Sequence, residues 1–261
     1  MTKFIGIISA KGGVGKTTTA INLTSALDWF KRDVIVMDAN FSNPNVAVHL
    51  GMHKFDKTVH SALKGKHSLR HAIHRHHTGL KLIPGDVSFA ESMNVKRMNL
   101  VDIAKDLSGH AEAVIIDSTA GLGGDCRAVI DASDFLIVVT TPDLISIGDT
   151  LRIKRLVREK KKNLLGVIVN RVSGREYEMS KESIEAFLEE KIIGIIPEDD
   201  KVGESLNYRS PVIYTHPHTP ASIGFKKAAG LLIGQKYEEK LTKEEDRSMF
   251  YYMLRNIGLM K

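Results

Sequence analysis

The stretch IISAKGGVGKTTTAINL, residues 7–23, places a glycine-rich turn between an apolar, β-branched run and a segment with helical spacing. Its pattern is that of a G-x-x-x-x-G-K-T loop. Glycines let backbone N–H groups curl around phosphate oxygens without Cβ clashes, and the start of the next helix adds partial positive charge. We therefore predict a phosphate-binding loop rather than a glycine turn without a ligand. The loop residues expected to contact the ligand are Gly12, Gly13, Val14, Gly15, Lys16, Thr17 and Thr18.

Two of these loop residues carry the chemistry. Lys16 is expected to reach the β- and γ-phosphates of a nucleotide. Thr17 is expected to place its hydroxyl on Mg²⁺, which keeps most of its waters and bridges the phosphates. The sequence thus predicts a site for a magnesium-bound nucleoside triphosphate.

Seven apolar runs recur along the chain between segments of helical spacing. Continuous rather than alternating runs indicate strands that are buried on both faces, and the intervening segments have the length of crossover helices. We therefore predict an α/β fold, a doubly wound, mainly parallel sheet in a three-layer α/β/α arrangement. The runs are FIGIIS, DVIVMD, LKLIPG, AVIIDS, FLIVVTT, LLGVIVNR and IIGIIP, and the predicted helices span 16–30, 100–107, 147–161, 180–190 and 222–232.

Composition limits the classes of protein that this chain can represent. Apolar residues make up 43% of the 261 residues, as in an ordinary globular protein. The chain has no run of 18 or more apolar residues, the length needed to cross a bilayer. The N-terminus lacks a signal-peptide pattern, so we expect a cytoplasmic protein. The single cysteine, Cys126, excludes an internal disulfide and a cysteine-rich metal site within one chain. The net charge of +6 is compatible with contact to DNA or anionic lipid but decides nothing alone.

The segment KGGVGKT gives the chain a family resemblance. With Lys11 before the glycines it resembles the deviant Walker A ATPases of the MinD/ParA family, and the resemblance extends over nearly all of residues 3–235. It implies an ATP-dependent homodimer in which Lys11 crosses to the partner's phosphates. The other interpretation of Lys11 is a solvated surface charge. We expect an ATPase domain at residues 1–235, followed by a charged and then amphipathic tail at residues 236–261.

Other landmarks of this family follow in order along the chain. VIIDSTAG, residues 114–121, looks like the Walker B strand and its switch loop. The resemblance implies that Asp117 holds Mg²⁺ through water and that Gly121 senses the γ-phosphate. The family usually has proline where Thr119 stands, which bears on the stiffness of this loop.

The expected adenine site lies further along the chain. VIVNR ends at Asn170 and Arg171, and IIPEDDKVGES matches the segment whose backbone closes over the base in the family. The resemblance assigns adenine recognition to the amide of Asn170, although an asparagine at a strand end is equally typical of a turn. The residues expected around the base are Asn170, Arg171, Pro197, Glu198 and Asp199.

One position departs from the family pattern. The second strand leads into Asp38-Ala39-Asn40, whereas the family has D-x-D and assigns the second carboxylate to the attacking water. A neutral amide can orient a water, but it cannot accept the proton, and general-base help is typically worth about 10²- to 10⁴-fold. We therefore predict slow ATP hydrolysis and a long-lived ATP-bound dimer. In the alternative, Asn40 only caps the turn and another group, such as Asp38, orients the water.

Eight of the 11 histidines lie within residues 49–77. If this segment is helical, His67, His71 and His74 share one face, which is one way to build a metal site. No carboxylate or cysteine accompanies them, so a solvated basic face is favoured, and contact with phosphates of DNA or lipid is the third interpretation.

The tail has a pattern of its own. If RSMFYYMLRNIGLMK, residues 247–261, is helical, its apolar residues line one side, as in the short membrane-binding helix of MinD-type proteins. Docking on protein is the alternative. The first interpretation predicts peripheral contact with an anionic inner membrane surface, strengthened when an ATP-bound dimer presents two tails.

The sequence leaves three functional hypotheses. The first is a MinD-like dimerising ATPase that acts with an activator protein as a spatial switch in cell division or cell organisation. The second is a dimeric scaffold that holds ATP with negligible hydrolysis, and the third is a ParA-like ATPase that binds nonspecific DNA. Iron–sulfur carriers of this class need paired cysteines, and bacterial tyrosine kinases carry an arginine that DANFSNPN lacks.

Overall fold

The computed structural model describes residues 1–88 and 100–239. The predicted tail at residues 247–261 lies outside the described residues, so the choice between lipid and protein docking stays a prediction. Within the described ranges, no helix is long and apolar enough to span a bilayer.

A single eight-stranded sheet organises the described chain. Its strand order is β3-β4-β2-β5-β1-β6-β7-β8, and every pairing is parallel except that of β3 with β4. The predicted doubly wound α/β fold is therefore confirmed, and each of the seven predicted runs forms a parallel strand. The strands are β1 (Lys3–Ser9), β2 (Val34–Asp38), β3 (His74–Arg75), β4 (Lys81–Ile83), β5 (Ala113–Ala120), β6 (Phe135–Thr140), β7 (Asn163–Val172) and β8 (Ile192–Pro197).

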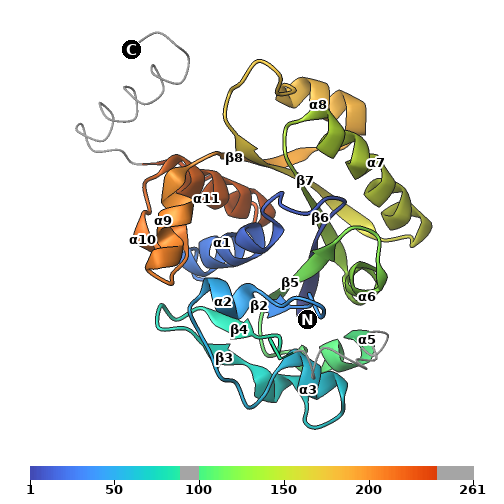
Figure 1. Ribbon diagram of the computed structural model, residues 1–261, viewed down its shortest axis with the longest axis vertical. Helices are drawn as coiled ribbons and strands as arrows, with labels where there is room; N and C mark the ends of the chain where they lie inside the picture. Colours follow the sequence, from blue (N-terminus) through green and yellow to red (C-terminus); the bar gives the residue numbers. More distant parts are fainter. Residues whose placement is uncertain (89–99, 240–261) are drawn as a thin grey trace.

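Helices cover both faces of the sheet (Figure 1). One face carries α1 (Lys16–Trp29), α2 (Val46–His49), α9 (Asp200–Asn207), α10 (Val212–Thr215) and α11 (Pro220–Leu232). The other face carries α3 (Val59–Leu63), the 3₁₀ turns η1 (Leu69–Ala72) and η3 (Lys105–Leu107), α5 (Leu100–Ala104), α6 (Gly124–Ala132), α7 (Leu144–Glu159) and α8 (Lys181–Leu188).

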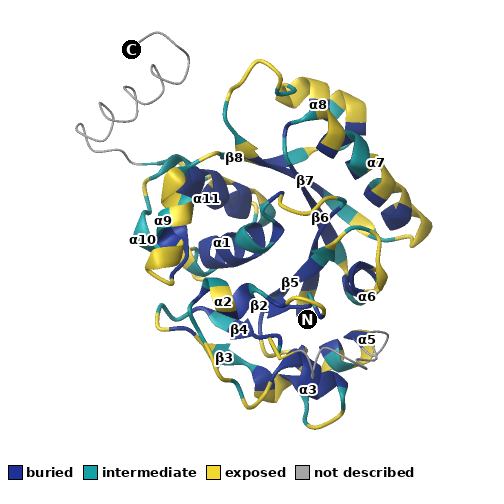
Figure 2. Ribbon diagram, in the orientation of Figure 1, coloured by how far each residue is buried: buried dark blue, intermediate teal, exposed yellow. Residues whose placement is uncertain are grey.

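The core consists of two apolar layers, one on each face of the sheet. In β2, Ile35 and Met37 point into one layer while Val34 and Val36 point into the other. This explains the continuous apolar runs, because successive side chains of a central parallel strand point to opposite faces of the sheet and both faces are buried. Figure 2 shows the central strands and most of α1 as buried, whereas α7 and α8 expose their outer faces.

The topology fixes where a ligand can bind. β1 pairs with β5 on one side and with β6 on the other. The chain adds β2 and β4 on the β5 side and later adds β6, β7 and β8 on the opposite side, so the strand order reverses at β1. Ligands of open α/β sheets bind at such a point, beyond the carboxyl ends of the strands. The glycine-rich loop follows β1 at this edge, and Asp38, the last residue of β2, lies side by side with Asp117 of β5.

The structure contradicts the helical interpretation of the histidine-rich segment. His67 precedes η1, His71 lies in that 3₁₀ turn and His74 begins β3, so the three do not share a helix face. The prediction was wrong because the extended backbone of Ser68 and Ile73 interrupts the segment on both sides of the 3₁₀ turn. Among the described residues, no group of three or more His, Cys, Asp or Glu side chains is placed to hold a metal ion.

Candidate functional site

The glycine-rich loop is shaped by left-handed backbone. Gly13 and Gly15 have φ angles of +82° and +84°, and Gly15 is the N-cap of α1, which begins at Lys16. An L side chain at either position would be strained, whereas glycine is not. Val14 between them is buried and fixes the loop on the core. The G-x-x-x-x-G-K-T pattern is not complete, since Ala10 stands at its first glycine, a position without positive φ.

Lys16, Thr17 and Asp117 form a polar cluster at the start of α1. The Thr17 hydroxyl donates to Asp117 Oδ2 at 2.6 Å, and Lys16 Nζ lies 3.6 Å from Asp117 Oδ1. Asp117 is fully buried, and its Oδ1 has no hydrogen-bond partner. A buried carboxylate oxygen without a donor, next to a threonine hydroxyl, is the donor set that Mg²⁺ prefers, so these residues fit that ion.

Asp38 holds its own loop together. Its carboxylate accepts backbone N–H bonds from Asn40, Asn45 and Val46, at 3.1, 2.8 and 2.9 Å. Burial and the neighbouring charge of Asp117 raise the pKa of Asp38 to about 7, although these three bonds lower it. Asp38 therefore fixes the turn after β2 and the start of α2. That it also orients the water that attacks ATP stays a prediction.

The Asp117 carboxyl group experiences opposing influences. Burial raises its pKa, while the Lys16 ammonium and the Thr17 hydroxyl lower it. A second carboxylate, that of Asp38, is its register partner on β2. Two buried carboxylates side by side are costly when both are ionised, so a cation between them and the phosphates would relieve the repulsion.

Asn40 lies in a tight turn beside this cluster. Its side-chain oxygen accepts the backbone N–H of Asn43 at 3.1 Å, and its own N–H donates to Asp38. The capping contact of the alternative interpretation is thus present. A role toward the water is not tested by this contact, because the amide nitrogen of Asn40 is a separate donor.

Asn170 joins the end of β7 to the phosphate loop. Its amide nitrogen donates to the Val14 carbonyl at 2.8 Å, and the side chain is 5% exposed. A Cβ added to Gly15 would come within 2.2 Å of that nitrogen, so the glycine is needed for this close approach. The predicted adenine residue and the phosphate loop are therefore in direct contact.

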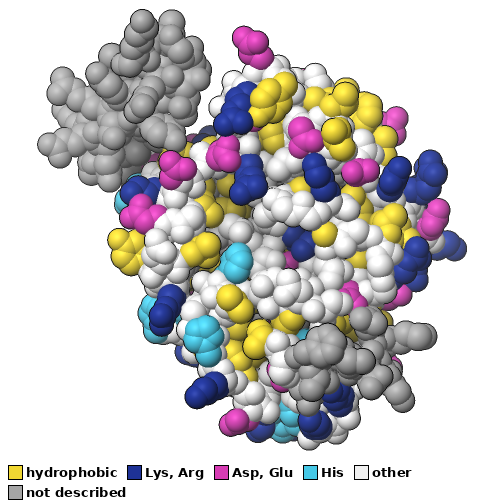
Figure 3. Space-filling model, viewed as in Figure 1, with side chains coloured by type: hydrophobic (Ala, Val, Ile, Leu, Met, Phe, Trp, Pro, Cys, Tyr) yellow, Lys and Arg dark blue, Asp and Glu magenta, His cyan; other side chains and the backbone are white. Residues whose placement is uncertain are grey.

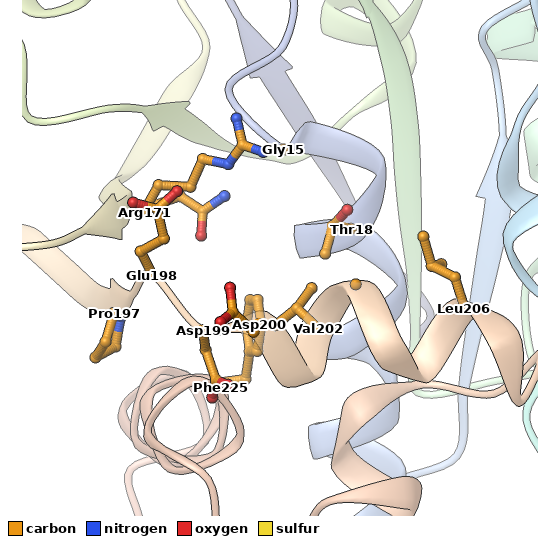
Figure 4. A pocket seen from close by; sticks show the side chains of 12 residues that line it. Gly15, Thr18, Arg171, Pro197, Glu198, Asp199, Asp200, Val202, Leu206 and Phe225 are labelled. Atoms are coloured by element: carbon orange, nitrogen blue, oxygen red, sulfur yellow. The ribbon is translucent and has the colours of Figure 1, made fainter. Parts of the chain in front are cut away.

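A pocket of about 310 Å³ opens next to Asn170. Arg171, Pro197 and Glu198 lie on one side of it, and Thr18 of α1 and Val202 of α9 lie on the other (Figure 4). The predicted base-binding residues therefore surround one cavity. The sequence did not single out Leu206 and Phe225, which also line it; they are ordinary apolar positions of α9 and α11, so no local signal marks them.

Three predicted residues occupy the rim of the site. Arg171 has a left-handed φ of +59°, and its guanidinium donates to the Gly13 carbonyl at 3.2 Å. Asp199 caps α9 by accepting the Lys201 N–H. Pro197 ends β8.

Gly121 and Lys11 face the phosphate side. The N–H of Gly121 donates to the Ser9 carbonyl at 2.9 Å, so a phosphate-sensing role requires this bond to change. Thr119 continues β5 to Ala120, and a proline there would remove its N–H donor. Lys11 is exposed and acts on the Asp143 carboxylate through its charge. It is accessible to a second chain.

The sequence profile of the CobQ/CobB/MinD/ParA nucleotide binding domain matches residues 5–212. The chain belongs to this family. This span contains the phosphate loop, Asp38, Asp117, Asn170 and all residues that line the pocket except Phe225.

Relatives of this MinD/ParA chain cover almost its whole length. An uncharacterised ATP-binding protein of Methanocaldococcus jannaschii is 35% identical over 93% of this chain and 92% of its own length. The flagellum site-determining protein YlxH of Helicobacter pylori is 32% identical over 98% of this chain and 91% of its own length. Among solved structures, MinD of Pyrococcus horikoshii in complex with Mg-ADP has a TM-score of 0.85, with 27% identity over 94% of this chain and 99% of that one.

These similarities establish the fold and the nucleotide-binding class. The MinD/ParA chain is a P-loop protein of an ATPase family whose relatives include site-determining proteins of septa and flagella. The residues present fit ATP and Mg²⁺ in general terms.

Proposed function

We propose that this chain is a MinD-like, Mg·ATP-dependent dimerising ATPase that acts as a spatial switch in cell division or cell organisation. The observation that carries the proposal is the Lys16–Thr17–Asp117 cluster beside the Asn170 pocket. It supplies a cation for phosphate oxygens, a ligand set for Mg²⁺ and an amide for a base within one continuous edge of the sheet.

Each residue has a role in binding and positioning. Lys16 binds the β- and γ-phosphates, and the loop N–H groups from Gly12 to Thr18 surround the phosphate chain. Thr17 binds Mg²⁺ directly and Asp117 binds it through water; when bound, the ion neutralises charge that develops on the phosphates. Asn170 reads adenine between Arg171 and the 197–199 segment.

Lys11 is the proposed contact to a second copy. Its side chain is exposed at the phosphate edge, where it is free to reach the phosphates of a partner chain. The proposed dimer then forms only with bound triphosphate, because the γ-phosphate supplies the charge that Lys11 binds.

Hydrolysis is proposed to be slow. Asn40 cannot accept a proton from water, and Asp38 directs its oxygens to three backbone N–H groups. Positioning and charge stabilisation remain, and these account for most of phosphoryl-transfer catalysis.

A single-turnover assay tests this proposal. Mg·ATP is bound to the wild-type chain and to Asn40→Asp, and product formation and ATP affinity are measured separately. We expect similar affinities and a rate increase of about 10²- to 10⁴-fold in Asn40→Asp. Asn43→Asp, which adds the same charge three residues away, serves as the control. Equal rates in wild type and Asn40→Asp would contradict the argument that hydrolysis is slow because Asn40 replaces a carboxylate.

The ATP-holding scaffold is the second candidate, and one contact favours it. The Asn40 oxygen is engaged by the Asn43 N–H, so Asn40 is held as a turn cap. A wild-type chain that binds Mg·ATP and dimerises without measurable turnover would support the scaffold and contradict the ATPase.

The cellular surface is a separate part of the proposal. The spatial role is suggested by relatives named as septum and flagellum site-determining proteins. Sedimentation with anionic liposomes, using full-length protein and a variant ending at residue 239, each with ATP or ADP, tests membrane contact. ATP-enhanced binding that is lost on truncation supports it.

The DNA-binding alternative predicts a different result. Lys and Arg side chains gather over the α7 edge of the molecule (Figure 3), where Arg152, Arg155 and Arg158 are exposed. Salt-sensitive binding to nonspecific DNA that is lost when these arginines are replaced would favour it.

A further inference from the structure

The turn after β2 is fixed from several directions. Asp38 accepts three of its N–H groups, and Asn40 caps Asn43. Phe41 is fully buried, with its carbonyl bonded to His60 Nε2 at 2.9 Å and the two rings edge to face. These contacts fix the turn internally and against His60. They do not connect it to the loop that begins at Gly121.

A bond from Ser42 supplies that contact. The Ser42 hydroxyl donates to Asp125 Oδ2 at 3.1 Å. Asp125 is the second residue of α6, directly after the loop that begins at Gly121, and it is 5% exposed. The Ser42–Asp125 bond therefore joins the Asn40 turn to the helix that follows the predicted γ-phosphate sensor.

The start of α6 also lies within the electrostatic reach of the phosphate loop. Burial raises the pKa of the Cys126 thiol to about 11, and the Lys16 ammonium acts in the opposite direction. Cys126 follows Asp125 directly in α6. The start of α6 is thus bonded to the Asn40 turn through Asp125 and feels the charge of Lys16, the first residue of α1.

We propose that Asp125 is a positioning residue for ATP hydrolysis, which acts through Ser42 to hold the Asn40 turn against the Gly121 loop. This inference rests on the proposed ATPase function. A neutral amide contributes only by orienting the water, so its effect depends on how rigidly its turn is held relative to the γ-phosphate. A bond from a serine hydroxyl to a buried carboxylate is suited to this, because a hydrogen bond to a charged group is stronger than a neutral one.

The test compares three substitutions in the single-turnover assay. Ser42→Ala and Asp125→Ala remove the bond, and each should lower the hydrolysis rate about tenfold, equivalent to about 1.4 kcal/mol in the barrier, with ATP affinity changed less than twofold. Asp125→Asn retains an oxygen that accepts from Ser42 and should keep the rate within about threefold of wild type. The double variant Ser42→Ala/Asp125→Ala should be no slower than the slower single variant.

A matched pair provides the control. Ser68 donates to Asp106 at 2.7 Å on the exposed surface, so Ser68→Ala removes a similar bond outside the nucleotide site. It should leave the rate unchanged. Ser42 is itself exposed, so Ser42→Ala tests the proposal even if Asp125→Ala does not fold.

The outcomes separate the inference from the function on which it rests. If the wild-type chain hydrolyses ATP and Ser42→Ala does so at the same rate, the positioning role is refuted while the ATPase stands. An inactive Asp125→Asn would also contradict it, because that variant keeps the bond and loses only the charge. If the wild-type chain binds Mg·ATP without turnover, both the ATPase and this inference fail.

Discussion

Replacing Gly15 by alanine tests the contact between the phosphate loop and the adenine side. Gly15 has a φ of +84° and is the N-cap of α1. The methyl group of alanine would lie within 2.2 Å of Asn170 Nδ2, a distance that real Cβ atoms do not reach. The amide of Asn170 must therefore move and release the Val14 carbonyl.

The magnitude follows from three terms. Left-handed backbone costs a non-glycine residue about 1–2 kcal/mol. Loss of the Asn170–Val14 hydrogen bond costs about 1 kcal/mol. The smaller entropy of unfolded alanine returns about 0.4–1 kcal/mol. The free energy of unfolding should therefore fall by about 2 kcal/mol, before any nucleotide is bound.

Two assays measure the effect. Urea unfolding without nucleotide gives the stability change, and titration with a fluorescent adenine nucleotide gives the affinity, which should fall at least about tenfold because Asn170 is displaced. The matched control is Gly148→Ala in α7, where an added Cβ meets nothing within 4 Å and φ is not positive. This control should be neutral or slightly stabilising. Wild-type stability and affinity in Gly15→Ala would refute the contact between Gly15 and Asn170.

Three further predictions concern the metal, pH and a buried lysine. Thr17→Ala should weaken binding of Mg·ADP at least about tenfold while changing ADP binding in EDTA little, measured by calorimetric titration. The folded-state pKa of Asp38 is raised from 3.8 to about 7, so its contribution to stability is complete below pH 4 and is lost as pH rises toward 7. The free energy of unfolding of the metal-free protein should therefore fall with pH between 4 and 7. Asp38→Asn should remove up to about 1.4 kcal/mol per pH unit from this slope, measured by urea unfolding across that range. Lys226 is 2% exposed, and its Nζ lies 4.9 Å from the ring centre of Trp29, the single tryptophan. Lys226→Met should therefore change the fluorescence of Trp29. It should alter the free energy of unfolding by less than about 1.5 kcal/mol and leave nucleotide affinity unchanged. An unshifted emission spectrum would contradict this placement of Trp29.

The sequence predicted the long elements better than the short ones. The seven parallel strands could be recognised because most of their side chains are buried on both faces of the sheet, which leaves continuous apolar runs. Helices α2, α3, α6, α9 and α10, each of four to nine residues, were missed, and only α5 and α8 among the helices this short were predicted, since so few turns leave little helical period to detect. The start of α7 precedes its predicted position by three residues because Asp143 caps it by accepting the Ser146 N–H.

Within the site, the sequence by itself determined the residue types and their order. The glycines, Lys16 and Thr17 are contiguous, and Asp117 and Asn170 lie in the carboxyl-terminal halves of recognisable strands, so their placement at one sheet edge follows from parallel topology. Only the tertiary structure decided which side chains touch. The partners Asn170 and Val14 are 156 residues apart in the chain, and Ser42 and Asp125 are 83 apart. Such contacts depend on strand order and helix packing to within an ångström, and no local pattern records them, because hydrogen bonds require distances near 3 Å.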